Sequence, residues 1–327
     1  MRYFITSCLI LWTSIAHTYE IEAQTEFNVE GATSTLNIIS TTDTAVFAPV
    51  IASFQATNPQ INVIYTAASS SQINAAIVED NAQFDIAISS AMDLQTKLAN
   101  DGYAQATASS ATTLVPGWGK WRNSIFAFSQ EPATIVLNRA AFEGQKIPQT
   151  RAELITLLRN QPAKYENRIG TYDVRTSGLG YLFATQDSRT SETFWRLTEL
   201  MGQLKVKLYC CSSDMIEDVS TGKVLIAYNV LGSYASARDD IKDKIMIIEP
   251  KDYATVMLRT ALVLKNNNAQ REAGIFLDHL LLEAWNEQPI NQGQHLRRIP
   301  LGPGLLVFLD RLKRQQFLQE WTSAILQ

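Results

Sequence analysis

The chain has 327 residues, a formal net charge of −4 and a sequence pI near 5.5. An acidic balance of this kind argues against a nucleic-acid-binding surface, which needs clustered basic side chains. It leaves room for a small anionic ligand, because a cleft can be locally positive on an acidic protein.

The first 23 residues are predicted to be a secretory signal peptide. A basic start is followed by an apolar run over residues 4–16, which is too short to span a bilayer and ends in small residues. Cleavage after Ala16 or after Ala23 fits this pattern, and Cys8 lies too early in the run to anchor a lipid. A buried N-terminal helix is the alternative. We expect an exported, soluble protein of the periplasm.

Export leaves a mature chain of about 300 residues, which is more than one hydrophobic core usually supports, so the length predicts two domains. No other apolar segment of the sequence is long enough to cross a membrane. The sequence also contains no internal repeat, which argues against a solenoid or a propeller.

The first part of the mature chain predicts a β-α-β-α-β order, which is typical of parallel βα units. Asn58 and Pro59 stop the first of the two helices. The expected elements are strands at 36–40, 61–65 and 84–88 and helices at 46–54 and 73–77. The polar stretch before them, residues 17–32, shows no periodicity.

Residues 125–138 hold two strand-like runs around the turn signal Glu131-Pro132, where we place the first crossing between two lobes. Thr150 and Glu153 form a capping box that opens a helix, and a return crossing follows at residues 250–252. Further strands are expected at 168–172, 224–228, 245–248 and 260–264, and helices at 179–184, 193–202 and 276–281, with a last helix that packs Leu312, Phe317 and Trp321.

This order predicts an α/β protein with two lobes, each a mixed sheet flanked by helices, joined by a two-strand hinge. Residues 33–130 and 254–303 are assigned to lobe 1, and residues 131–253 and 304–327 to lobe 2. A cleft between lobes built from discontinuous sequence suits closure around a ligand.

Three hydroxyl-rich turns at the carboxyl ends of predicted strands are candidate ligand-binding elements. Ligands of open α/β sheets bind at that edge, and the N–H groups that begin a helix carry partial positive charge. The alternative is that these hydroxyls only cap their own helices. The candidate residues are Thr41, Thr42, Asp43, Thr44, Ser69, Ser70, Ser89 and Ser90.

The loop over residues 173–180 is the candidate for the opposite side of the cleft. Arg175 is able to make paired charge-assisted hydrogen bonds to a carboxylate or phosphate, with Thr176 and Ser177 beside it. A glycine turn with a surface arginine is the alternative. Tyr228 and Asn229 leave another strand, either to reach ligand oxygens or to pack as hinge residues.

Cys210 and Cys211 are the only cysteines after the signal segment. A bond between adjacent cysteines closes a strained eight-membered ring, so no disulfide framework is expected. A redox or metal pair is possible in principle, but no second Cys or His cluster accompanies the two residues. We therefore interpret them as buried small residues.

No catalytic centre is predicted. The sequence has no Gly-x-Ser-x-Gly elbow, and neither His279 nor His295 lies at a predicted strand end beside a carboxylate. Trp118 and Trp121 are able to stack on a sugar, although such residues more often pack a linker. We expect no enzyme, no metal and no cofactor.

Five segments resemble, in order and spacing, the periplasmic binding proteins of the ferric-iron and sugar-phosphate ABC transporter group. They are Ile39–Asp43, Phe84–Asp93, Glu131–Asn138, Ser177–Tyr181 and Ala227–Ser233. Within that group the chain is most similar to the branch of the phosphoglycerate-transport regulatory protein and the hexose-phosphate binding proteins. The resemblance extends over nearly the entire mature chain.

The resemblance implies a type II periplasmic binding protein fold, ligand contacts at the turns named above, and an ABC permease or a membrane sensor histidine kinase as partner. Iron binders of the group place adjacent tyrosines near Tyr228-Asn229, and this chain lacks such a pair. We therefore expect a monomeric receptor that closes on a phosphate ester or a carboxylate and presents it to a permease. An accessory protein of a sensor kinase and a ferric-iron binder are the alternatives.

Overall fold

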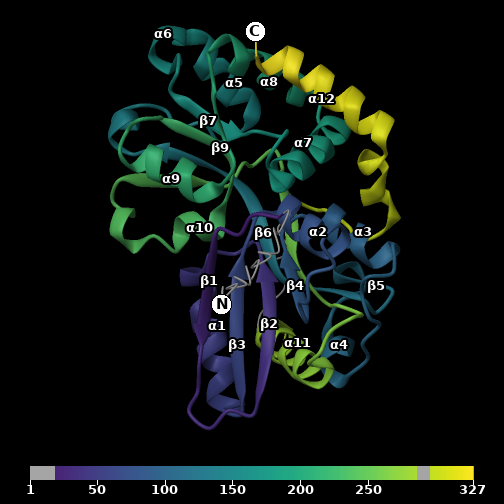
Figure 1. Ribbon diagram of the computed structural model, residues 1–327. Helices are drawn as coiled ribbons and strands as arrows, with labels where there is room; N and C mark the ends of the chain where they lie inside the picture. The colour runs from purple at the N-terminus through teal and green to yellow at the C-terminus, as the bar shows by residue number, and fades with distance from the viewer. Residues whose placement is uncertain (1–18, 286–294, 327) are drawn as a thin grey trace, which may run out of the picture.

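The computed structural model describes residues 19–285 and 295–326 and shows two lobes joined through a shared strand (Figure 1). Most of the predicted signal peptide, residues 1–18, lies outside the described residues. No helix in the described part of the chain combines the length and the apolar character needed to cross a bilayer.

Lobe 1, the lower one in Figure 1, contains a mixed sheet in the order β1-β3-β2-β4-β11-β6. Strands β2, β3 and β4 are parallel, whereas β1 and β11 run antiparallel to their neighbours. Its strands are β1 (Ala23–Phe27), β2 (Ser34–Ser40), β3 (Ile61–Ala67), β4 (Ile86–Ser89), β5 (Lys120–Trp121), β11 (Ala254–Val263), β12 (Leu296–Arg298) and part of β6 (Ile125–Asn138). The three predicted N-terminal strands are confirmed.

Helices cover both faces of this sheet because successive strand residues point to opposite sides. Ile38 packs with Phe54 and Phe276 under α1 and α11, whereas Ile39 packs with Ile73 under α2. The helical elements of this lobe are α1 (Thr44–Thr57), α2 (Ser70–Val78), α3 (Met92–Asn100), α4 (Ser110–Leu114), the short η1 (Gly117–Gly119) and α11 (Gln270–Trp285).

Lobe 2 contains a sheet in the order β6-β9-β7-β8, with β10 on the other side of β6. Its strands are β7 (Ile169–Tyr172), β8 (Lys207–Tyr209), β9 (Ile226–Leu231) and β10 (Ile245–Ile248). Its helical elements are η2 (Ala140–Phe142), α5 (Arg151–Asn160), α6 (Pro162–Tyr165), α7 (Gly178–Thr190), α8 (Thr193–Gln203), α9 (Ser212–Ser220), α10 (Gly232–Ser236), η3 (Asp239–Ile241), η4 (Pro303–Leu309) and α12 (Arg311–Ile325).

The predicted turn at Glu131-Pro132 is wrong, because β6 is one continuous strand of 14 residues. It pairs with β11 as far as Pro132 and with β9 from Ala133, so the change of partner falls where the crossing was predicted. Proline has no N–H to donate and is tolerated where a ladder is interrupted. The Glu131 carboxylate is buried and pairs with Arg259 at 2.8 Å, so the charge that suggested a turn is neutralised inside the molecule.

Three segments in the described part of the chain connect the two lobes. Besides β6, the chain crosses between β10 and β11 and again between β12 and η4, after which α12 packs on lobe 2. Phe317 and Trp321 of α12 are buried in the lobe 2 core as predicted. Leu312 is not, because 69% of its surface is exposed at the start of that helix.

Two local predictions also need correction. The stretch before residue 33, which showed no periodicity, contains the edge strand β1. Backbone hydrogen bonds to β3 hold this strand in place, and they require no apolar pattern in the sequence. At α5, Thr150 accepts the N–H of Glu153 at 3.1 Å, as predicted. The return bond of the capping box is displaced by one residue, because the Glu153 carboxylate accepts the N–H of Gln149 at 2.7 Å.

Candidate functional site

A cavity of about 110 Å³ lies between the lobes, where the carboxyl ends of the parallel strands face each other. Lobe 1 contributes Glu22 before β1 and residues that follow β2, β3 and β4, and lobe 2 contributes residues at or after the ends of β7, β8 and β9. The lining residues are Glu22, Thr41, Asp43, Ala68, Ser69, Ser70 and Ser90 from the first and Tyr172, Thr176, Ser177, Gly178, Leu179, Cys210, Cys211, Ser212, Ser213, Leu231 and Tyr234 from the second.

The N-terminal ends of four helices, α1, α2, α7 and α9, meet at this cavity. Their N-cap residues are Asp43, Ser69, Ser177 and Cys211, and all four line it. The first N–H groups of a helix have no partner inside the helix and carry partial positive charge, so they attract an anion. The wall of the cavity therefore offers positive potential from the backbone of both lobes.

The cap hydroxyls of α2 and α7 are partly occupied by their own helices. Ser69 accepts the N–H of Gln72 at 3.4 Å, and Ser177 accepts the N–H of Gly180 at 3.2 Å. The N-caps of α1 and α9 make no such side-chain bond. Ser69 of lobe 1 and Ser177 of lobe 2 thus combine the two roles that the sequence left open for the hydroxyl-rich turns, since each caps its helix and lines the cavity.

The charged side chains at the cavity are acidic. Glu22 and Asp43 line it, and none of its lining residues is basic. Burial raises the pKa of Glu22, and the nearby carboxylates of Asp43 and Asp214 raise it further. Asp43 also accepts a hydrogen bond from the Ser213 hydroxyl of lobe 2 at 3.0 Å. An anion bound here has to rely on N–H and hydroxyl donors, and the carboxylates are free to accept from hydroxyl groups of the same ligand.

The lobes touch each other where α2 and α7 begin. A Cβ atom added to Gly178 would lie 2.2 Å from the Ser70 hydroxyl oxygen, closer than any side chain tolerates. Thr41 accepts the Ser90 N–H at 3.2 Å on the adjacent turn of lobe 1. The described arrangement is therefore a closed one, in which glycine allows the two helix starts to approach.

Seven of the predicted site residues line the cavity: Thr41, Asp43, Ser69, Ser70, Ser90, Thr176 and Ser177. Three others belong to the same turns but not to its lining. Thr42 is fully buried, Thr44 begins α1, and the Ser89 hydroxyl accepts the N–H of Ala91 at 3.1 Å.

Arg175 does not lie at this cavity, contrary to the geometry expected from the sequence. Its guanidinium binds the carboxylate of Asp173 through two hydrogen bonds of 2.8 and 2.6 Å, because that acid precedes it by only two residues. The side chain lines a separate open groove of about 610 Å³ on lobe 2, together with Arg311 and Arg314 of α12.

Tyr228 and Asn229 also point away from the cavity. Tyr228 is 4% exposed, and its hydroxyl accepts a 2.7 Å hydrogen bond from the buried Arg151 guanidinium. Asn229 donates to the buried carboxylate of Asp187 at 3.3 Å, and Asp187 accepts a second bond from Thr255 at the start of β11. These two residues therefore take the packed hinge role that was the alternative.

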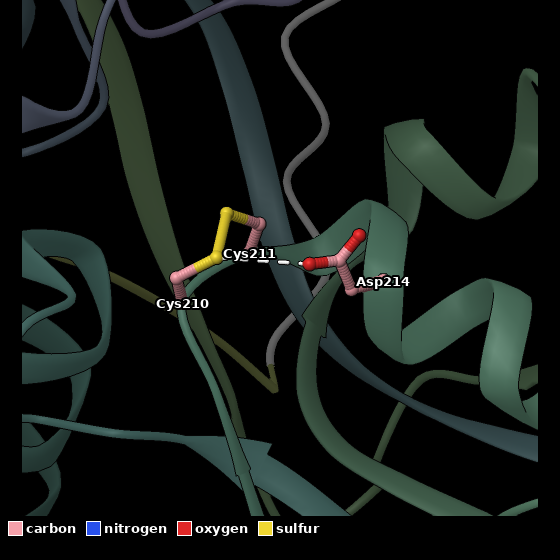
Figure 2. Close-up of side chains that lie close together, drawn as sticks. All are labelled: Cys210, Cys211 and Asp214. Atoms are coloured by element: carbon pink, nitrogen blue, oxygen red, sulfur yellow. Dashed lines mark hydrogen bonds between the residues drawn. A yellow bond between two sulfur atoms is a disulfide. The ribbon is translucent and has the colours of Figure 1, made fainter. Parts of the chain in front are cut away.

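The interpretation of Cys210 and Cys211 as buried small residues is wrong. Cys210 is exposed, Cys211 is half-buried, and the two are joined by a disulfide (Figure 2). Both residues line the cavity. The Cys210 sulfur lies 3.7 Å from a carboxylate oxygen of Asp214. Burial had been inferred from residue type, whereas the position directly after β8 places the pair at the cleft.

Sequence reasoning missed several lining residues. Glu22 was counted within the signal peptide, and Tyr172 and Tyr234 carried no motif. Ser212 and Ser213 begin α9 shortly after β8, and this strand-to-helix position was the one available signal. The Ser212 and Tyr172 hydroxyls share a short hydrogen bond, which ties the beginning of α9 to the end of β7.

The sequence matches the model of the bacterial extracellular solute-binding protein family over residues 36–287. The substrate-binding protein of an ABC transporter from Agrobacterium tumefaciens has a similar crystal structure, with 32% identity, a TM-score of 0.87, and coverage of 93% of this chain and 98% of that chain. No curated protein matches the sequence.

Two more distant structures share the fold. The periplasmic binding protein AfuA from Actinobacillus pleuropneumoniae, solved with fructose-6-phosphate, is 16% identical with a TM-score of 0.69 over 90% of this chain and 99% of that chain. Iron-bound HitA from Pseudomonas aeruginosa is 17% identical with a TM-score of 0.63 over 89% and 99%. The predicted two-lobed α/β fold of the periplasmic binding proteins is thereby confirmed.

Proposed function

The chain belongs to the bacterial extracellular solute-binding protein family, and from this premise we propose that it captures a small anionic solute between its lobes. As a solute-binding protein it is not an enzyme. The convergence of four helix N-termini on a cavity lined by serine and threonine hydroxyls supports the anion most strongly.

The acidic side chains narrow the class of anion. Glu22 and Asp43 repel a bare polyanion, but they are good acceptors for hydroxyl groups. A phosphate ester of a polyol uses both kinds of group, with the phosphate at the N-termini of α2, α7 or α9 and the hydroxyls at the carboxylates of Glu22 and Asp43. We therefore favour a sugar phosphate over inorganic phosphate and over di- or tricarboxylates. The similarity to AfuA, solved with fructose-6-phosphate, is in keeping with this preference.

A thermal-shift screen of the mature protein tests the ligand class, because a ligand that binds only the folded state raises the melting temperature. We expect a saturable rise with a sugar phosphate and little change with inorganic phosphate or citrate. Ser90→Ala should then weaken binding about tenfold through loss of a hydroxyl donor to a charged group. Arg175→Ala is the matched control outside the cavity. The absence of a shift from every phosphate ester and carboxylate would refute the anionic ligand.

Ferric iron is the second candidate, because Glu22, Asp43, Tyr172 and Tyr234 supply hard oxygen atoms around the cavity. The two tyrosines argue against ferric iron as the ligand. Burial raises the pKa of Tyr234 to about 12 and raises that of Tyr172 as well, so both phenols resist the ionisation that ferric ion requires. A visible tyrosinate charge-transfer band on addition of ferric citrate would favour iron, and its absence would favour the ester.

We further propose that the protein works as a monomer in the periplasm and presents its closed form to an ABC permease. The 32% identical structure from A. tumefaciens belongs to an ABC transporter, which supports a permease over a sensor kinase. Stimulation of the permease ATPase by liganded but not by empty protein is the expected result. Stimulation of a histidine kinase instead would identify the alternative partner.

Signal cleavage after Ala16 agrees better with the cavity than cleavage after Ala23. Glu22 lines the cavity, and its N–H donates to the Ala67 carbonyl at 2.9 Å on the edge of the lobe 1 sheet. Cleavage after Ala23 would remove Glu22 from the cavity and with it the hydrogen bond to Ala67. The mass of the protein recovered from the periplasm should correspond to a chain that begins at His17.

A further inference from the structure

The disulfide between Cys210 and Cys211 lies where it is able to influence ligand binding. Both residues line the cavity, and α9 begins at the next residue. We propose that this disulfide is a redox-controlled part of the cleft: the oxidised ring holds the start of α9 in place, and its reduction loosens that segment and weakens ligand binding. The part of this statement that concerns affinity rests on the proposed function.

The ring restricts the two residues that precede the helix. A disulfide between neighbours closes a ring of eight atoms that includes the peptide bond, so the backbone of Cys210 and Cys211 has few accessible conformations. Reduction opens the ring and returns ordinary backbone freedom to both residues. In the reduced protein this segment has to become ordered each time the cleft closes. The ordering costs conformational free energy, whereas the segment of the oxidised protein is already ordered.

The residues directly after the ring connect it to both lobes. The Ser212 hydroxyl shares a hydrogen bond with the Tyr172 phenol at the end of β7. The Ser213 hydroxyl donates to the Asp43 carboxylate at 3.0 Å, which bridges lobe 2 to lobe 1. Both serines also line the cavity. Loosening of this turn therefore acts on the ligand wall and on a contact that favours closure.

The disulfide is accessible to a reductant, because Cys210 is exposed to solvent. A dithiol, such as a protein thiol–disulfide oxidoreductase or dithiothreitol, attacks one sulfur as a thiolate, breaks the S–S bond and forms a mixed disulfide. Its second thiolate then attacks the mixed disulfide and releases the cysteine that was still bound to the dithiol. The dithiol loses two electrons and becomes a disulfide, and Cys210 and Cys211 each end as a thiol. The Cys210 thiol is then able to donate to Asp214, 3.7 Å away, which favours the open form.

The first test needs no ligand. Dithiothreitol should add two hydrogens to the mass of the mature wild-type protein, whose only cysteines after residue 8 are this pair. Amide hydrogen exchange over residues 211–215 should then become about tenfold faster, while exchange in β2 and β3 stays unchanged. The variant C210S/C211S should show the fast exchange with and without reductant. Equal exchange in oxidised and reduced protein would overturn the proposal whether or not the solute is an anion.

The second test measures affinity with fructose 6-phosphate as the probe. We expect binding about tenfold weaker after reduction, which corresponds to about 1.4 kcal/mol, and equally weak binding by C210S/C211S in either condition. Ser213→Ala keeps the disulfide and should reproduce part of the loss. Equal affinity of oxidised and reduced protein would overturn control of binding. If the probe does not bind at all, the proposed ligand class fails, and the exchange experiment alone decides the role of the ring.

Discussion

The two walls of the cleft are built differently. On lobe 1, side-chain hydroxyls such as those of Thr41, Ser70 and Ser90 face the cavity from turns that follow parallel strands. On lobe 2, Arg175 is bound to Asp173, and the polar groups of Tyr228 and Asn229 on β9 are bound inside the lobe. Lobe 2 lines the cavity with hydroxyls and helix N-termini, as lobe 1 does, and adds a disulfide that lobe 1 lacks among the described residues. The basic side chains named here thus stabilise lobe 2, whereas hydroxyls, backbone N–H groups and two carboxylates line the cavity.

The largest effect is expected where a charge of lobe 2 is buried. The Arg151 side chain is inaccessible to solvent and binds Asp252, Tyr228 and the Tyr253 carbonyl, which connects α5 to the hinge. Arg151→Ala should lower the free energy of unfolding by about 3–5 kcal/mol, because the buried Asp187 carboxylate loses the positive charge of Arg151 and the buried Tyr228 hydroxyl loses its donor. Urea denaturation measures this change. Arg175→Ala, an exposed arginine of the same lobe, is the control, and an equally stable Arg151→Ala would remove the distinction between the two arginines.

The next effect concerns the contact between the walls. Gly178→Val places a side chain where a Cβ atom would already lie 2.2 Å from the Ser70 hydroxyl oxygen, so it should hold the lobes apart. We expect solute affinity to fall about 100-fold, equivalent to about 2.8 kcal/mol, with the melting temperature of the empty protein little changed. Gly274→Ala in α11 meets no atom within 4 Å and should bind normally. Normal binding by Gly178→Val would mean that closure does not bring these helix starts together.

A smaller, pH-dependent effect is expected at Asp93 of lobe 1. Burial raises its pKa to about 6, although Leu94 N–H and the more distant Arg314 act in the opposite direction. The unfolded carboxyl titrates near pH 4, so the folded protein binds the extra proton between about pH 4 and pH 6 and gains stability as the pH falls through that window. The contribution is about 1.3 kcal/mol between pH 7 and pH 5. Chemical denaturation at both values should show it in wild type and not in Asp93→Asn, whereas the same pH dependence in both proteins would assign it to other groups.

The difference between the walls also explains how far the sequence could be interpreted. The strand-to-helix turns of lobe 1 are local features, so strand ends and cap residues were sufficient to place Ser69, Ser70 and Ser90 at the cavity. In lobe 2 the positions of the candidate side chains depend on hydrogen-bond partners that periodicity does not reveal. Asp173 binds Arg175, and Arg151, which is distant in sequence, binds Tyr228. Residue type alone likewise suggested burial of the cysteines, since it carries no information on the bond that joins them.

The smallest effect is expected from Arg175, which the sequence placed at the centre of the second wall. Its guanidinium is held by Asp173 outside the cavity, so Arg175→Ala should change solute affinity less than twofold in a calorimetric titration. A loss of tenfold or more would show that the loop rearranges to bring this arginine to the ligand.

A crystal structure of the mature protein with a bound sugar phosphate tests the central claim most directly. We predict the phosphate within hydrogen-bond distance of the first N–H groups of α2, α7 or α9, and the sugar hydroxyls at Glu22 or Asp43. A phosphate held instead in the groove of Arg175, Arg311 and Arg314 would contradict the account, because basic side chains and not helix N-termini would then bind the solute.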